Sequence, residues 1–277
     1  MITLTDFISR EKARLWSGKH LQDVTFQLNR FCNFNNYGDR SLDSFVAHDI
    51  HEFQEHLIGN GLAKSTANRY NAAISKIFDH AVKGEVINHA PRFNWFKEKG
   101  NRIRYFTSSE IKQIEEFFGN HKHSWMKQMF IIGINTGMRL GEITQIGDTA
   151  HVETDAEGSV WLYLPQTKNG DERYVPLNKP AQKAIQELGG RVLDHYSHRK
   201  FYNAWDDCRY AVAKNDESFV FHVCRHTAAS RLANDLGTQT ILIGALLGHR
   251  SEQTTRKYVH AKPSTLQDIA KQLGKVA

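Results

Sequence analysis

The sequence predicts a mainly α protein in two parts, a helical bundle followed by an α+β part with a small antiparallel sheet. Three observations support this prediction. Residues 1–90 show helical periodicity, a basic and poorly periodic stretch interrupts the pattern near Lys99, and two alternating segments flank Asn169-Gly170. The chain has 277 residues and a mass of 31.8 kDa, which exceeds the commonest single-domain size. We therefore expect two domains.

The first part is predicted to be helical throughout, because its apolar residues recur three and four positions apart. Ser65 is the expected N-cap of the last of these helices, and Gly84 is placed to end it. The predicted helices are Leu4–Trp16, Leu21–Tyr37, Ile50–Gly59 and Ser65–Val82.

A linker is predicted after Pro91, where the helical pattern stops and basic residues accumulate. The stretch contains Lys97, Lys99, Arg102 and Arg104, and its charge suits a path along a phosphate backbone. The predicted domains are 1–98 and 99–277. Because the helical pattern starts close to the first residue, we expect no additional domain before it.

The second part begins with a capping box, in which Thr107 is the N-cap and Glu110 follows three residues later. Phe106 and Ile111 occupy the positions of a hydrophobic staple. The predicted helices here are Ser108–Phe118, Trp125–Asn135 and, after a break at Thr136-Gly137, Arg139–Ile146.

A β-hairpin is predicted next. Val160, Leu162 and Leu164 alternate with other residues, Asn169-Gly170 suits a type I′ turn, and Arg173–Leu177 forms the return strand. Lys168 therefore lies at the hairpin tip. The segment ITQIGDTAHVE after Glu142 is polar, so the start of the sheet stays open.

The rest of the chain is predicted to be helical. A short helix is expected through Tyr258. A tail helix is expected over 263–275, with Ser264 as its candidate N-cap and an apolar stripe of Leu266, Ile269, Ala270 and Leu273. The other predicted helices are Ala181–Leu188, Arg199–Ala213, His222–Asp235 and Thr238–Leu247.

Composition narrows the function classes. Thirty-six Lys and Arg against 30 Asp and Glu give a net charge of +6 and a pI of about 9.1, which favours a polyanionic partner. No apolar run approaches the roughly 20 residues that span a bilayer, and no signal peptide is evident, so we expect a cytoplasmic protein without membrane contact. Cys32, Cys208 and Cys224 form no C-x-x-C pair, which indicates reduced structural thiols.

Three segments carry residues suited to phosphodiester chemistry: TGMRLGE, HVCRH and LLGHRSEQTTRKYVH. Attack on a phosphodiester builds negative charge on nonbridging oxygens, and the planar forks of Arg139 and Arg225 match that charge without a metal. Tyr258 is a candidate nucleophile, although a phenol needs a base or a cationic field at neutral pH. His222, three residues before Arg225, is the candidate base.

Taken singly, each of these residues can also have an ordinary structural role. A lone arginine after a glycine turn is usually salt-bridged, and a lone tyrosine usually packs. Histidine pairs at helical spacing suggest a metal, but no H-E-x-x-H motif or cysteine pair accompanies them, so no metal is predicted. These pairs are His222 with His226, His48 with His51, and His195 with His198.

The order and spacing of these motifs resemble the tyrosine recombinase (phage integrase) family, whose pattern is T-G-x-R-x-x-E, H-x-x-R, L-G-H and a tyrosine nine residues on. The segment GLAKSTANRYNAAISKIFDHAVKGEVINHAP also resembles the last helices of the family's core-binding domain. The resemblance thus covers most of the chain. It implies a SAM-like core-binding domain at residues 1–98 and a tyrosine-recombinase catalytic domain at 99–277.

The resemblance also implies residue roles. Arg139, Arg225 and His249 would bind the scissile phosphate, Tyr258 would attack it, His222 would be the base, and Lys168 would protonate the leaving 5′ oxygen. Glu142 would support Arg139. The first domain would bind DNA near a helix start, although a solvated helix face is the alternative. The DNA-binding candidates are Lys64, Thr66, Asn68, Arg69, Lys76, Arg102 and Arg104.

The implied function is site-specific recombination through a 3′-phosphotyrosine and a Holliday junction, serving integration or excision of a phage or other mobile element. The implied partners are double-stranded DNA and three further protomers in a tetramer on DNA; the free protein would be a monomer. An accessory DNA-bending factor is compatible with the family, and no cofactor is required. The location would be the cytoplasm of a bacterial host.

Alternatives stay open at this point. A Xer-like resolvase or an invertase would use the same residues, and a type IB topoisomerase or telomere resolvase would use similar chemistry. A binding-only DNA protein would be expected to lack part of the arginine and nucleophile set. A metal-dependent nuclease would lose activity in EDTA.

Overall fold

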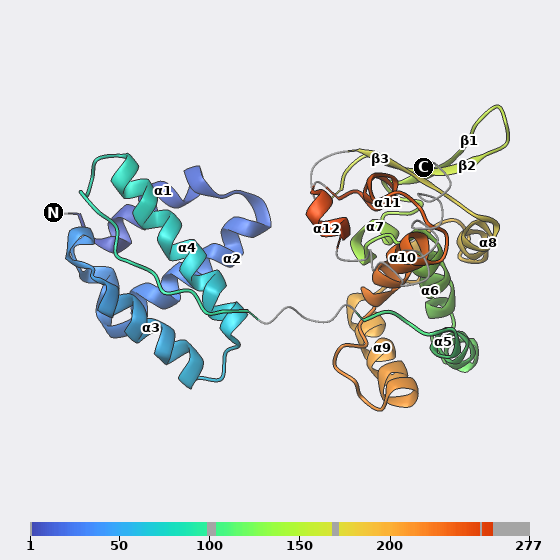
Figure 1. Cartoon of the computed structure of the whole chain (residues 1–277), viewed down its shortest axis with the longest axis horizontal. Coiled ribbons are helices and arrows are strands. Elements are labelled where there is room, and N and C mark those ends of the chain that lie inside the picture. Colours follow the sequence, from blue (N-terminus) through green and yellow to red (C-terminus); the bar gives the residue numbers. More distant parts are fainter. Residues whose placement is uncertain (1, 99–103, 168–171, 250, 257–277) are drawn as a thin grey trace, which may run out of the picture. The chain divides into compact units, whose positions relative to one another are not determined.

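The chain divides into two compact units, Met1–Asn101 and Arg102–Ala277. The computed structural model describes residues 2–98, 104–167, 172–249 and 251–256. Helices dominate both units, and a three-stranded antiparallel sheet lies in the second (Figure 1). The predicted mainly α fold with a small antiparallel sheet is therefore confirmed. Within the described residues, no helix combines the length and the apolar character needed to cross a bilayer.

The first unit is a bundle of helices joined by short turns (Figure 1). The second helix begins at Gly18, earlier than expected, because Ser17 rather than a later residue is its N-cap. Ser65 is not an N-cap, since the last helix starts at Lys64 behind Ala63. The elements are α1 (Leu4–Leu15), α2 (Gly18–Asn33), η1 (Phe34–Asp39), η2 (Leu42–Ser44), α3 (Ala47–Gly59) and α4 (Lys64–Lys83).

The core of the first unit is built around aromatic rings. Phe31 is fully buried on α2 and makes edge-on contacts with Tyr37 and Phe53, at centroid distances of 5.3 and 5.0 Å. Arg40 closes the turn region with a forked ion pair to Asp49, at 2.6 and 3.1 Å. Aromatic pairs add stabilisation beyond their buried area, so this cluster fixes how the short connections lie on the helices.

Three buried amide side chains form hydrogen bonds with residues 94–98, in the segment that follows α4. Asn68 accepts a hydrogen bond from the Phe96 backbone N–H and donates to the Phe96 carbonyl and to Glu98. Gln54 and Asn71 both donate to the carbonyl of residue 94. Asn68 is among the predicted DNA contacts, but in the structure its side-chain amide is buried and occupied by these bonds.

The second unit opens with the predicted capping box. The Thr107 hydroxyl accepts from the Glu110 N–H at 3.2 Å, and the Glu110 carboxylate accepts from the Thr107 N–H at 2.8 Å. The helices of this unit are α5 (Ser108–Asn120), α6 (Trp125–Thr136), α7 (Leu140–Ile143), α8 (Lys179–Glu187), η3 (Val192–Asp194), α9 (His198–Ala213), α10 (Val223–Asn234), α11 (Thr240–Leu247) and α12 (Glu252–Arg256).

The sheet has the order β1–β2–β3, with β1 at His151–Thr154, β2 at Val160–Leu164 and β3 at Arg173–Pro176. Both strand pairs are antiparallel, and Leu162 lies opposite Val175. One face of the sheet is buried through Leu162, Leu164 and Val175. Strand β1 was not predicted, because its four residues are largely exposed and lack the apolar alternation of a half-buried strand.

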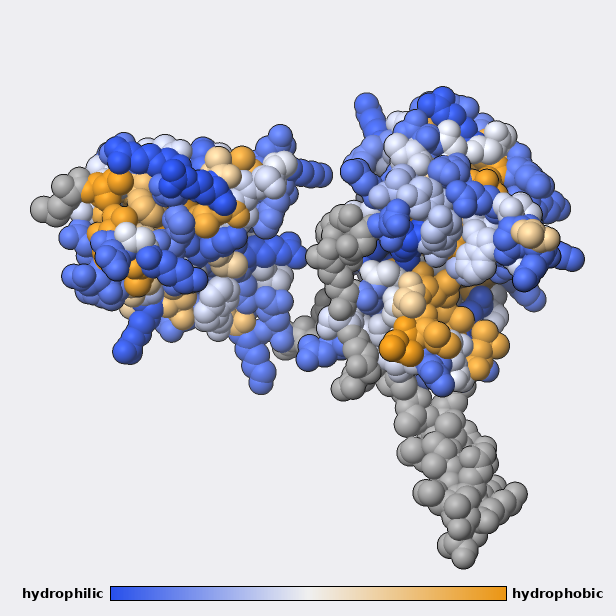
Figure 2. All heavy atoms as spheres, turned by 90° about the horizontal axis from the view of Figure 1, so that it is seen from above, coloured by the Kyte–Doolittle hydropathy of each residue, from blue (hydrophilic) through white to orange (hydrophobic). Residues whose placement is uncertain are grey.

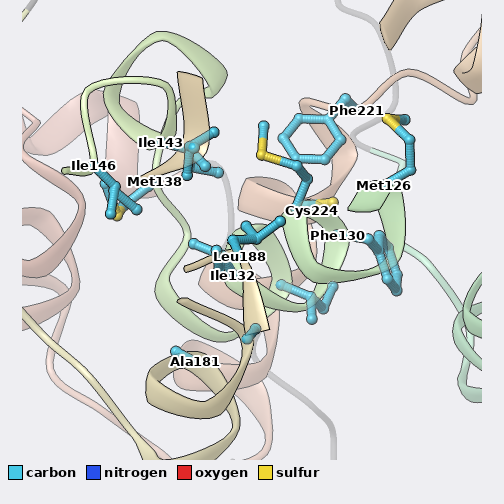
Figure 3. Packing of buried hydrophobic residues seen from close by; sticks show 14 of the residues in the cluster. Met126, Phe130, Ile132, Met138, Ile143, Ile146, Ala181, Leu188, Phe221 and Cys224 are labelled. Atoms are coloured by element: carbon cyan, nitrogen blue, oxygen red, sulfur yellow. The ribbon is translucent and has the colours of Figure 1, made fainter. Parts of the chain in front are cut away.

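A single hydrophobic cluster joins the sheet to α6, α8 and α10 (Figure 3). Met126, Phe130 and Ile132 of α6 are fully buried in this cluster, and Phe221 and Cys224, the latter in the first turn of α10, are buried with them. Close packing of this kind leaves little freedom for the elements that meet there. The cluster therefore fixes the ends of α6 and α10, which carry the candidate site residues.

On the face seen in Figure 2, both units are mostly hydrophilic, with hydrophobic patches among the polar residues. In the second unit, Leu236, Ile241 and Leu242 are 73%, 71% and 57% exposed. On α11 only Ile243 and Leu247 provide buried apolar anchors. Polar contacts at its C-terminal end must therefore help to hold α11 in place.

Candidate active site

Arg139 is placed by a tight break between two helices. Helix α6 ends at Thr136, Gly137 follows in the left-handed conformation at φ +65°, and Arg139 is the N-cap of α7. Only glycine suits position 137, because a Cβ there would come within 2.5 Å of the Leu247 side chain. The T-G-x-R turn thus brings the α6 end against α11.

The Glu142 carboxylate is almost completely buried and binds two arginines. One oxygen accepts from Nη1 of Arg139 at 2.8 Å. The other accepts from the Arg139 backbone N–H at 2.9 Å and from Nη2 of Arg173 at 2.8 Å. A buried carboxylate of this kind is stabilised by charge-assisted hydrogen bonds. The predicted contact between Glu142 and Arg139 is present, and it extends to an arginine of β3.

Arg225 lies in the first turn of α10 and is 2% exposed. Its Nη1 donates to the Gly137 carbonyl at 2.9 Å. His222 is the N-cap of this helix and is exposed, and its ring meets the His226 ring edge-on at 4.8 Å. The helix starts one residue later than expected, but His222 and Arg225 still lie within one turn of each other.

Three consecutive carbonyls at the end of α11 accept hydrogen bonds from three arginines. The carbonyl oxygens of residues 246–248 are bound, in that order, by Nη1 of Arg173 at 2.6 Å, Nη2 of Arg225 at 2.5 Å and Nη2 of Arg139 at 3.5 Å. The last carbonyls of a helix lack partners inside the helix and carry the negative end of its dipole. The end of α11 therefore gathers guanidinium groups from α7, α10 and β3.

His249 follows this helix end and is half-buried. Burial, with Arg225 and Arg139 as the next causes, lowers its pKa to about 4. Its Nδ1 lies 2.8 Å from the hydroxyl oxygen of Thr255, which is fully buried. The imidazole is therefore neutral at physiological pH and is oriented by a hydroxyl group.

The cluster has a net positive charge. Arg139, Arg173 and Arg225 carry three formal positive charges, and Glu142 supplies one negative charge. A region with this balance and a neutral histidine at its edge can bind an anionic group and stabilise negative charge that develops on it. A phosphate diester fits this requirement by charge and by guanidinium geometry.

Several sequence predictions lie outside the described residues. These are Lys168, Tyr258, Arg102 and the tail helix over 263–275. The residues that the structure does bring together are Arg139, Glu142, Arg225 and His249, with His222 at the start of the helix that carries Arg225.

The DNA-binding candidates in α4 divide by exposure. Lys64 and Arg69 are exposed and Thr66 is partly exposed, so these side chains can reach a ligand. Lys76 instead donates to the Leu15 carbonyl at 3.0 Å and lies over the Trp16 ring. This contact gives Lys76 a structural role that sequence reasoning missed.

Arg104, also predicted to contact phosphates, forms two ion pairs within its own unit. Its guanidinium pairs with Glu110 at 2.6 Å and Asp216 at 2.9 Å, and it lies over the Phe219 ring. Its side chain is 19% exposed. Arg104 therefore connects the start of the second unit to Glu110 and Asp216, and these two carboxylates neutralise its charge.

Arg173 and Thr255 are site residues that sequence reasoning missed. Arg173 was assigned only to a return strand, and Thr255 only to the spacing between His249 and Tyr258. A weak signal existed for Arg173, because its inward strand position alternates with Tyr174 and pairs with Leu164 on the buried face. A charged residue at a buried strand position requires a partner.

No group of three or more His, Cys, Asp or Glu side chains within the described ranges could hold a metal ion. Cys208 and Cys224 are buried, and burial raises the pKa of the Cys208 thiol to about 12. A thiol with such a raised pKa is a poor nucleophile at neutral pH.

Comparison with known proteins decides the family. Residues 104–265 match the Phage integrase family, and this region contains every residue of the cluster described above. The chain belongs to the phage integrase family. It is thus an enzyme of the tyrosine recombinase class, as the motifs predicted.

Individual relatives agree with this assignment. A shufflon-specific DNA recombinase of Escherichia coli is 35% identical over 172 residues, which cover 60% of this chain and 42% of that protein. The chain therefore spans less than half the length of that relative. The ICEBs1 integrase of Bacillus subtilis is 26% identical over 258 residues, covering 81% of this chain and 69% of that protein.

Solved structures show the same fold. The Tn1549 transposon integrase in complex with a circular intermediate DNA has a TM-score of 0.75 at 17% identity, covering 99% of this chain and all of that one. A lambda integrase dimer bound to a core site has a TM-score of 0.72 at 16% identity, covering 95% of this chain and 97% of that one.

Proposed function

We propose that this chain cleaves and rejoins double-stranded DNA at specific sites and serves the integration or excision of a mobile element. The observation that carries the proposal is the arginine cluster at the end of α11, with Arg139 and Arg225 oriented by carbonyl groups and His249 beside them. Relatives whose names include integrase and recombinase, and integrases crystallised with DNA, support the same activity.

The reaction begins with attack of the Tyr258 hydroxyl on the scissile phosphorus, while His222 takes the phenolic proton. The bond to the 5′ oxygen breaks, and Lys168 donates a proton to that oxygen. Arg139 and Arg225 stabilise the charge on the nonbridging oxygens. The products are a 3′-phosphotyrosine and a free 5′ hydroxyl.

The phosphotyrosine bond keeps the energy of the cleaved ester, so a 5′ hydroxyl from another strand can reverse the reaction. Exchange of one strand pair gives a Holliday junction, and exchange of the second completes recombination. We propose that four protomers act together on two duplexes, and that the first unit holds the DNA through the exposed side of α4, including Lys64 and Arg69.

A suicide-substrate assay tests the proposed activity. Nicked duplexes are tiled across the DNA that flanks the gene, with inverted repeats taken first, so that cleavage releases a short fragment and traps the covalent complex. We expect the full chain to form a covalent adduct in excess EDTA, and Tyr258→Phe to form none while still binding the same duplex.

Absence of an adduct on every flanking duplex, or an undiminished adduct with Tyr258→Phe, would contradict the proposal. Paired sites on a plasmid then separate recombination from its alternatives. Exchange between sites indicates a recombinase, relaxation alone indicates a topoisomerase, and hairpin ends indicate a telomere resolvase.

A further inference from the structure

We propose that Arg173 is a positioning residue that locks β3, the Glu142–Arg139 pair and the end of α11 into one catalytic arrangement. This inference rests on the proposed recombinase chemistry. Arg173 is not part of the arginine and histidine set that the sequence motifs identify, and it enters the site from the strand that follows the predicted Lys168 hairpin.

The first support is the geometry of the Arg173 fork. Nη2 donates to Glu142 at 2.8 Å, and Nη1 donates to the Leu246 carbonyl at 2.6 Å. A guanidinium can satisfy both acceptors at once because its donors lie in a fixed plane. Arg173 thus connects residues that are 31 and 73 positions away in the chain.

The second support is burial. The Arg173 side chain is 10% exposed and the Glu142 side chain is 3% exposed. Burial lowers the pKa of Arg173, whereas the Glu142 carboxylate raises it. A buried pair of this kind is costly to break because one charge is left uncompensated. Because its two terminal nitrogens bind Glu142 and the Leu246 carbonyl, the role assigned to Arg173 is to position these groups.

The third support is the packing of the turn after α11. Gly248 has φ +67°, and a Cβ at this position would lie 2.9 Å from Nη1 and 3.1 Å from Cδ of Arg173. The glycine therefore serves two purposes, since it permits the left-handed turn and leaves room for the guanidinium. His249 follows directly, so the position of Arg173 bears on the direction in which His249 points.

These contacts predict what loss of Arg173 does. Glu142 would keep Arg139 as its only arginine partner, and the carbonyl of residue 246 would lose its charged donor. Arg139 and His249 would then shift relative to each other, and misplacement of about 1 Å in an active site costs about a hundredfold in rate. DNA binding, which depends on many contacts, would change little.

The test uses single-turnover cleavage of the suicide duplex by the full-length protein, with the protein in saturating excess. Arg173→Gln and Arg173→Lys are compared with Arg191→Gln, which removes an arginine that is 50% exposed and pairs with two surface carboxylates. We expect Arg173→Gln to lower the rate constant about a hundredfold, with duplex Kd within a few-fold of wild type. Arg173→Lys should recover part of the rate, because lysine can serve one of the two acceptors.

The rate constant and the reaction amplitude separate positioning from folding. A purely structural role would lower the melting temperature and the amplitude, because fewer molecules are folded, and the folded molecules would cleave at the wild-type rate. A rate constant for both Arg173 variants equal to that of Arg191→Gln would overturn the inference. If wild type forms no covalent adduct, the proposed function fails, and the positioning role fails with it.

Where Arg173→Gln does not fold, Arg173→Lys provides the same comparison. Glu142→Gln, alone and with Arg173→Lys, then completes a double-mutant cycle on the rate constant. If Arg173 acts through Glu142, the effects of the two substitutions on the rate constant are not additive. Additive effects would show that Arg173 does not act through Glu142 and would contradict this part of the inference.

Discussion

The Nδ1 atom of His249 lies 2.8 Å from the buried hydroxyl group of Thr255. A neutral imidazole carries one proton. If that proton lies on Nε2 and is donated to a phosphate, Nδ1 is an acceptor and Thr255 is the donor. A hydroxyl group can serve as donor or acceptor to Nδ1; when Thr255 donates, the proton of the neutral imidazole lies on Nε2, where it can be donated to a phosphate.

Thr255→Val should lower the single-turnover cleavage rate about tenfold, because the valine keeps the shape and removes the hydroxyl donor. Thr255→Ser should retain most of the rate. The measurement is cleavage of the suicide duplex at pH 7.5, with melting temperature recorded for each variant. Equal rates for the valine and serine variants would show that the hydroxyl does not orient His249.

The lowered pKa of His249 predicts an acid sensitivity of folding. The unfolded chain binds a proton on this histidine near pH 6.5, whereas the folded chain does so only near pH 4. Between these values the unfolded state holds more protons, so stability falls as the pH falls through this window. Between pH 7.5 and pH 5, the melting temperature of His249→Gln should therefore fall less than that of the wild type. A parallel loss in both proteins would contradict the shifted pKa.

Arg139→Lys and Arg225→Lys test charge stabilisation. Each variant keeps the positive charge and loses the planar guanidinium fork, which binds two protein acceptors here, so cleavage should fall by about a hundredfold or more. Duplex affinity should change far less. Arg191→Lys, at the exposed salt bridge to Asp194, is the matched control. Cleavage within a few-fold of this control for both variants would exclude a role of the forks.

The helical parts of the fold could be predicted because their signals are local. The Thr107–Glu110 capping box and the helix break at Thr136-Gly137 follow from neighbouring residues, and the structure contains both. Strand β1 could not be predicted, since its four residues depend on pairing with β2. The local sequence pattern of a strand does not reveal which strand it pairs with.

The same distinction applies to the site. Arg139, Arg225 and His249 stand in recognisable motifs, whereas Arg173 acquires its role only when β3 meets the end of α11. Asn68, Lys76 and Arg104 have the chemistry of DNA contacts, but partners from distant positions occupy them. Residue type alone could not separate a phosphate ligand from a structural tie.

Asn68 and Arg69 are adjacent in the sequence, but we expect Asn68→Ala to lower stability and Arg69→Ala to weaken DNA binding. Asn68→Ala removes three hydrogen bonds to residues 96 and 98, so unfolding free energy should fall by about 1–3 kcal/mol. Arg69→Ala changes an exposed side chain and should alter stability by less than about 0.5 kcal/mol. Arg69→Ala should instead weaken duplex binding and reduce its salt dependence. Urea unfolding and binding titrations at two salt concentrations check both; unchanged salt dependence would place Arg69 away from DNA.

The tail over 263–277 offers the last prediction. Its sequence places Leu266, Ile269, Ala270 and Leu273 on one helical stripe, and so short a helix is marginal in water without a partner surface. We expect the tail to dock on a neighbouring protomer when several assemble on DNA. Deletion from Pro263 onward should leave single-site DNA binding intact while it weakens the four-protomer complex and strand exchange.

A paired substitution makes this test sharper. Ile269→Glu with Leu273→Glu places two charges on the apolar stripe, whereas Gln267→Glu with Gln272→Glu adds the same charge outside it. Native gels and light scattering report the complex, and a two-site plasmid reports recombination. If docking uses the stripe, only the first pair should reproduce the deletion, because burying a charge against an apolar surface is costly. Normal assembly and recombination by the deleted protein would show that the tail does not connect protomers.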